Sequence, residues 1–98
     1  MKINTLQVLC GMDGKPLMQG ENSIMLRDIC IGALLNPSDP EDDKKLSGED
    51  KVARFKLAQR FANNDSIEIT PEEATLVRHL VAKGYYTSIV GQVWDLLG

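Results

Sequence analysis

The stretch of this chain that comes closest to a binding-site pattern is the acidic segment 37–46 with the residues that follow it. A calcium-binding loop uses positions 1, 3, 5, 7, 9 and 12 for its ligands, and those positions hold Asp39, Glu41, Asp43, Lys45, Ser47 and Asp50. Such a loop also needs glycine at its sixth position for a sharp turn and a bidentate glutamate at its twelfth. This sequence has Lys44 and Asp50 there. We therefore expect an exposed acidic linker over 37–46 and no metal site.

No other group of residues forms a catalytic or cofactor-binding pattern. His79 is the only histidine, and no cysteine, aspartate or second histidine stands at ligand spacing from it. Glu72 and Glu73 are explained by the start of a helix, where carboxylates are favourable. Cys10 and Cys30 each lie in an apolar stretch, which favours buried reduced thiols, with a disulfide as the alternative. We predict that the protein is not an enzyme and has no catalytic residue, metal or cofactor.

Most of the aromatic residues gather near the end of the chain, and they form the candidate interface. An apolar face at helical spacing comprises Tyr86, Ile89, Val90, Val93, Trp94 and Leu97, and the neighbouring Tyr85 completes the candidate interface. Two interpretations are open: the face packs on the core of the domain, or it binds a protein partner or a second copy, because tryptophan and tyrosine are common interface anchors. Gly91 within the helix costs about 1 kcal/mol relative to alanine, which suggests a close helix contact there.

A group of basic residues marks the segment 51–60 and supplies an alternative function. Lys51, Arg54, Lys56 and Arg60 lie there, although their angular positions spread too widely for one stripe. They form a solvated face, or they contact phosphate or an acidic partner. A nucleic-acid-associated regulator using this helix is therefore the alternative. The net charge of −3 and the pI of about 5.0 argue against it, because nucleic-acid binders normally carry a basic face.

Length and composition fit one globular domain over residues 1–98. The chain has 98 residues, of which 43% are hydrophobic and 26% charged, so whole-chain disorder is not expected. No signal-peptide pattern opens it, because polar residues follow Lys2. No apolar run approaches the roughly 20 residues of a membrane span. We expect a cytoplasmic protein with no membrane contact and no evident small-molecule ligand.

The N-terminal region predicts a β-hairpin. Residues 3–10 alternate as a strand with Leu6 and Val8 on one face. Asp13-Gly14 is a strong turn signal, and residues 17–19 return as a short second strand. A further turn follows at Gly20.

Helical patterns fill the rest of the chain. A first helix begins near Leu26, capped by Asn22 or Ser23, and ends before Pro37; its inward face is Leu26, Ile29, Cys30, Ala33 and Leu34. A second begins after the cap Ser47, with an apolar stripe of Val52, Phe55, Ala58, Phe61 and Ala62.

The strongest local signal is Thr70-Pro71-Glu72-Glu73, a capping box with proline in the first turn. The third helix that it opens should bury Ala74, Val77, Leu80 and Val81, and end with Gly84 as the residue after the cap. A fourth begins near Thr87. The expected fold is thus α+β and predominantly helical, an N-terminal β-hairpin packed with about four short helices.

The order of these motifs resembles small uncharacterised phage and prophage proteins. The resemblance rests on the Asp13-Gly14-Lys15-Pro16 turn, the Leu26-Arg27-Asp28 helix start, Thr70-Pro71-Glu72-Glu73 and the closing helix with Val90-Gly91-Gln92-Val93-Trp94. It implies a role in virion assembly or in binding a host protein, and it implies no catalytic residues. Together these observations predict a non-enzymatic protein–protein interaction module.

Overall fold

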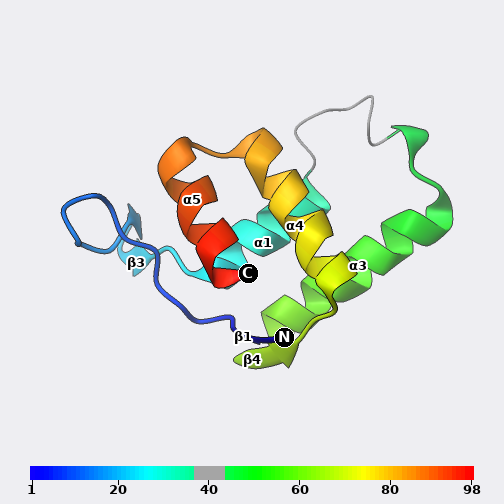
Figure 1. Cartoon of the computed structure of the whole chain (residues 1–98), viewed down its shortest axis with the longest axis horizontal. Helices are drawn as coiled ribbons and strands as arrows, with labels where there is room; N and C mark the ends of the chain where they lie inside the picture. Colours follow the sequence, from blue (N-terminus) through cyan, green and yellow to red (C-terminus); the bar gives the residue numbers. More distant parts are fainter. Residues whose placement is uncertain (37–43) are drawn as a thin grey trace.

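Four α-helices and two small antiparallel strand pairs make up the described part of the chain, which comprises residues 1–36 and 44–98 of a computed structural model. The fold is α+β and predominantly helical, as the sequence predicts. The helices are α1 (Leu26–Leu35), α3 (Gly48–Asn63), α4 (Pro71–Gly84) and α5 (Thr87–Leu96). The strands are β1 (Lys2–Asn4), β2 (Met18–Gln19), β3 (Asn22–Ser23) and β4 (Ser66–Glu68). Figure 1 shows α1 behind α4 and α5, with α3 extending to one side. Much of the acidic linker, with Asp39, Glu41 and Asp43 of the calcium pattern, lies outside the described residues.

The N-terminal strand is shorter than predicted and has a different partner. Of the first ten residues only Lys2–Asn4 form a strand, β1, and it pairs with β4, so that Ile3 stands opposite Ile67. Both isoleucines are buried, whereas Leu6 and Val8, which were predicted to share one face of the strand, are only half-buried. The prediction of one strand over residues 3–10 was wrong, because buried Thr5 interrupts it. The Thr5 hydroxyl donates to the Asn64 carbonyl at 2.6 Å, which ties the chain to the end of α3.

The turn predicted at Asp13-Gly14 is confirmed. The amide of Gly11 donates to the carbonyl of Lys15 at 2.9 Å, and Gly14 has a φ of 79°, a conformation that glycine adopts without steric cost. The amide of Leu17 donates to the carbonyl of Leu9, so the chain does return beside its own first segment. The turn at Gly20 then joins β2 to β3.

Helix α1 buries all five residues of its predicted inward face. Its predicted cap was wrong: the N-cap is Met25, not Asn22 or Ser23. The amide of Met25 donates to the Asp28 carboxylate at 2.9 Å. The two polar residues form β3, because extended pairing continues as far as the bridge between Val8 and Met25 and delays the helix.

Helix α3 begins as predicted but buries a different stripe. The Ser47 hydroxyl accepts from the amide of Asp50 at 3.0 Å, so the predicted cap is confirmed. Of the predicted stripe, Ala58 and Phe61 are buried, together with Leu57. The other predicted members, Val52, Phe55 and Ala62, are exposed. The prediction placed the buried stripe on the wrong side of the helix, because α1 and β4 pack along the side of α3 that carries Leu57 and Phe61.

Helix α4 follows its sequence pattern most closely. The Thr70 hydroxyl accepts from the Glu73 amide at 3.1 Å, and the Glu73 carboxylate accepts from the Thr70 amide at 2.9 Å. All four predicted inward residues are buried. The expectation for Gly84 was wrong, because it is the last helical residue and has no positive φ. The chain leaves α4 through extended Tyr85 and enters α5 directly, so no left-handed residue is needed.

Candidate protein-interaction surface

The seven residues predicted as an interface do not share one environment. Val93 and Leu97 are fully buried and belong to the core. The partly buried members pack against that core and are Tyr85, Ile89 and Val90. Only Tyr86, 83% exposed, and Trp94, 45% exposed, face solvent to a large extent. The inner side of α5 therefore docks on the domain, while Trp94 on its outer side and Tyr86 at its N-cap remain open to solvent.

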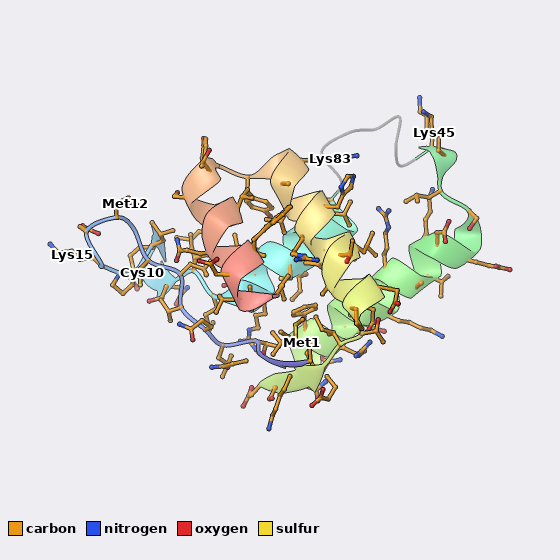
Figure 2. The ribbon with its side chains drawn as sticks, viewed as in Figure 1. Met1, Cys10, Met12, Lys15, Lys45 and Lys83 are labelled. Carbon is orange, nitrogen blue, oxygen red and sulfur yellow. The ribbon has the colours of Figure 1, made fainter. Side chains whose placement is uncertain are left out.

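Helix α5 is held in place by a side-chain clamp that the sequence did not reveal. The Gln92 carboxamide accepts from the Cys10 amide at 2.8 Å and donates to the Cys10 carbonyl at 2.6 Å. This pairing copies the two hydrogen bonds of a strand partner and satisfies both backbone groups of Cys10. Cys10 lies at the base of the loop whose tip carries Met12 (Figure 2). Together with the burial of Val93 and Leu97, the clamp holds α5 in one rotation about its axis.

Trp94 is anchored to α4 by its edge and by one face. The indole N–H donates to the Arg78 carbonyl at 3.1 Å. The Arg78 guanidinium lies 5.4 Å from the centre of the ring, within the range of a cation–π contact. Because its only polar group has a partner, the ring can lose water on its open side without leaving a donor unsatisfied. These two contacts hold the Trp94 ring in one position with its open side toward solvent.

A hollow of about 470 Å³ lies beside Trp94 between α4 and α5. It is lined by Ala82, Tyr85, Thr87, Val90, Gly91, Trp94 and Asp95. A Cβ atom added to Gly91 would meet no atom within 4 Å. The expectation of a close helix contact at Gly91 was therefore wrong. The missing side chain instead keeps the hollow open, and this unexplained helical glycine was the one sequence signal that pointed to it.

A second groove, of about 800 Å³, lies at the N-terminal end of α5 and shares Tyr85 with the hollow. Its lining includes Tyr86 at the N-cap of α5, Ile89 of α5 and Ile29 of α1. The Tyr85 hydroxyl lies over Gly32 of α1, where an added Cβ would come within 2.5 Å of it. Burial, and then the neighbouring Cys30, raise the pKa of Tyr85, so its hydroxyl stays protonated. The Tyr85 side chain lines both depressions and lies between them.

The remaining chemical candidates do not converge. His79 is exposed on α4. Both cysteines are free, and burial raises the pKa of the Cys30 thiol to about 12, which makes it a poor nucleophile. Within residues 1–36 and 44–98 no cluster of histidine, cysteine or carboxylate side chains could hold a metal ion.

The basic residues of α3 are also divided. Arg60 forms an ion pair of 2.6 Å with Glu73 and donates to the Glu68 carbonyl, so it braces α3 against β4 and α4. Arg54 is half-buried, and Lys56 is exposed on another side of the helix. The structure brings no basic stripe together here, and nothing in this arrangement favours phosphate binding over a structural role.

No family model matches the chain, and no curated protein or solved structure matches it either. Among the helices of the described segments, none has the length and apolar content needed to cross a membrane.

Proposed function

We propose that this protein is a non-enzymatic protein-interaction module, and that the outer side of α5 binds an apolar side chain of a partner protein. The observation that carries the proposal is the open hollow beside Trp94. Partly exposed aromatic residues that are already held in place lose little conformational freedom on binding, which makes them good anchors.

The chemistry of the hollow defines what fits. Val90, Ala82 and the Trp94 ring offer apolar contact, and its volume of about 470 Å³ has room for a large aliphatic or aromatic side chain and part of its neighbours. Asp95 at its margin adds one negative charge, so a basic residue next to the apolar anchor would be favoured. The expected roles in virion assembly or host-protein binding, and a cytoplasmic location, are compatible with such a partner.

Selection of peptides from a display library, followed by titration, tests the proposal. Trp94 is the only tryptophan, so its fluorescence reports directly on the hollow. We expect selected peptides to carry an apolar anchor and to change the Trp94 emission. Gly91→Leu should fill the hollow and weaken binding at least roughly tenfold, a loss of about 1.4 kcal/mol.

Gly48→Leu is the matched control, because Gly48 is also a helical glycine with no atom within 4 Å of an added Cβ. It adds the same side chain on α3 and should leave peptide affinity unchanged. Peptides that bind Gly91→Leu as tightly as the unmodified protein would place the binding surface elsewhere.

A further inference from the structure

The loop over residues 11–16 presents an apolar side chain to solvent. Of the large apolar side chains that the structure describes, Met12 is the most exposed, at 98%. Figure 2 shows Met12 and Lys15 at the outer end of this loop, which projects from one end of the molecule. The loop is braced internally, because the Gly11 amide donates to the Lys15 carbonyl at 2.9 Å and the Gly14 amide donates to the Gly11 carbonyl at 3.0 Å. A loop that is fixed before binding loses little conformational freedom when its tip is buried.

We propose that Met12 of one copy of this chain enters the hollow beside Trp94 of a second copy. The inference rests on the proposed function of that hollow and names the chain's own loop as one of its occupants. No residue of the loop lines the hollow of its own copy. In Figure 1 the loop and α4 lie on opposite sides of α5, whereas the hollow lies between α4 and α5. The contact therefore joins two molecules.

The side chain and the hollow match in their chemistry. Methionine is flexible and polarizable, so it fills irregular spaces, and its sulfur makes favourable contacts with aromatic rings. The hollow of about 470 Å³ has two aromatic residues in its lining, Tyr85 and Trp94, and Gly91 leaves it open. The indole N–H of Trp94 already has a partner, so an apolar neighbour leaves no donor of this ring unsatisfied.

The loop presents one positive charge beside Met12. Lys15 is exposed at the same end of the loop. The other charged residue of the loop, Asp13, is turned toward the loop's own backbone: its carboxylate accepts from the Lys15 amide at 3.0 Å and lies 3.1 Å from the position of a Cβ atom on Gly11. Lys15 is thus the charge that the loop directs outward.

The hollow presents one negative charge. Asp95 is the charged residue of its lining. The Arg78 guanidinium is engaged with the Trp94 ring at 5.4 Å and is not part of the lining. Lys15 of the entering loop therefore suits Asp95. An exposed ion pair contributes little free energy, so the charges orient the loop while burial of the methionine supplies the attraction.

The contact joins two different surfaces of the chain. Two copies can exchange loops reciprocally, or further copies can add, and both arrangements bury the same contact. The interface is small, so association should be reversible and should increase with concentration. A bound partner protein and a second copy would occupy the same hollow, so each should exclude the other.

Sedimentation equilibrium over a concentration series tests the proposal. The unmodified protein should associate, and Met12→Ser should weaken association at least roughly tenfold. Gly91→Leu should have a similar effect because it fills the hollow. Met18→Ser is the matched control, since Met18 is 54% exposed on β2 but its sulfur already accepts from the Ser23 hydroxyl at 3.7 Å. This control should associate like the unmodified protein, and circular dichroism melts should show all three variants folded.

Mixing the variants distinguishes a loop-to-hollow contact from any other contact. Met12→Ser keeps an open hollow, and Gly91→Leu keeps an intact loop. An equimolar mixture should therefore associate more strongly than either variant alone. The proposal is overturned if the unmodified protein is monomeric up to about 1 mM. It is equally overturned if Met12→Ser associates normally, or if the mixture associates no more than its components.

Peptide titration separates failure of this inference from failure of the proposed function. Monomeric Met12→Ser should bind the selected peptides at least as tightly as the unmodified protein, because no loop competes for its hollow. If these peptides bind in the hollow while the unmodified protein stays monomeric, self-association is wrong and the proposed function stands. If no peptide binds the hollow of Met12→Ser, the proposed function itself is wrong.

Discussion

Phe55 and Phe61 lie on the same helix, yet the first is half-exposed and the second is completely buried. The C-terminal half of α3, which carries Phe61, packs on α1 and leads into β4. No element of residues 1–36 or 44–98 covers the N-terminal half in this way, and that half carries Phe55. An apolar residue on a helix is therefore core or surface according to what lies beside it, and its residue type alone does not decide.

The two halves also differ in their polar contacts. The C-terminal half is braced by the Arg60–Glu73 ion pair and by the hydrogen bond from Thr5 to Asn64. In the N-terminal half, the cap hydrogen bond joins Ser47 to Asp50 within the same helix end, and this bond reaches no other element. We therefore expect the C-terminal half to unfold only with the whole domain, and the N-terminal half to open locally at a lower free energy.

The largest expected effect comes from truncating the two phenylalanines. Phe61→Ala should lower the free energy of unfolding by about 3–5 kcal/mol, because it leaves a cavity in the core. Phe55→Ala should lower it by about 1 kcal/mol or less, as is usual for exposed positions. Urea unfolding of both variants measures the difference, and equal losses would mean that the two halves are equally buried in solution.

The two helix caps should differ in how far their loss spreads. Thr70→Ala removes a reciprocal capping box and should destabilise the whole domain by about 1 kcal/mol. Ser47→Ala removes a similar hydrogen bond, but amide hydrogen exchange should show faster opening confined to the first turns of α3. If hydrogen exchange in Ser47→Ala became faster by the same factor across the whole domain, the N-terminal half of α3 would not open independently of the rest.

The Arg60–Glu73 ion pair, in the C-terminal half of α3, should make the free energy of unfolding depend on pH. Burial raises the pKa of Glu73, but the hydrogen bond from the Thr70 amide and the charge and hydrogen bond of Arg60 outweigh it, so the net pKa is lowered from 4.5. Glu73 thus stabilises the fold above about pH 4.5, and this contribution is lost as the pH falls through the lower, folded-state pKa.

Glu73→Gln should keep the hydrogen bond to the Thr70 amide while removing the titration. Urea unfolding from about pH 3 to pH 7 measures the free energy of unfolding. As the pH falls over this range, Glu73→Gln should lose roughly 0.5–1 kcal/mol less than the unmodified protein loses. Identical pH profiles would show that Arg60 and Glu73 are not coupled in solution.

The smallest expected effect concerns the N-terminal half of α3. Gly48→Ala should raise stability by a few tenths of a kcal/mol, because alanine loses less conformational entropy in a helix and the added Cβ meets no atom within 4 Å. Thermal unfolding by calorimetry measures the shift. A clear loss of stability would mean that another part of the protein packs closely against the start of α3.

Local sequence signals determined much of the fold. The cap residues Ser47 and Thr70 fixed two helix starts, and apolar spacing identified every buried residue predicted on α1 and α4. These signals work because capping and helical periodicity depend on residues only a few positions apart. The Asp13-Gly14 turn was predictable for the same reason.

Contacts between distant residues decided the rest. The pairing of β1 with β4, the stripe that α3 buries, and the clamp of Gln92 on Cys10 join segments far apart in sequence. On α3 two apolar stripes compete, and the positions of α1 and β4 select one. On α5 the same apolar face was compatible with core and interface, and the clamp divided it between them. The sequence by itself thus determined where helices begin and which residues are apolar. Only the tertiary structure decided which apolar residues water still reaches, because burial depends on what packs beside a residue and not on its own position along the chain.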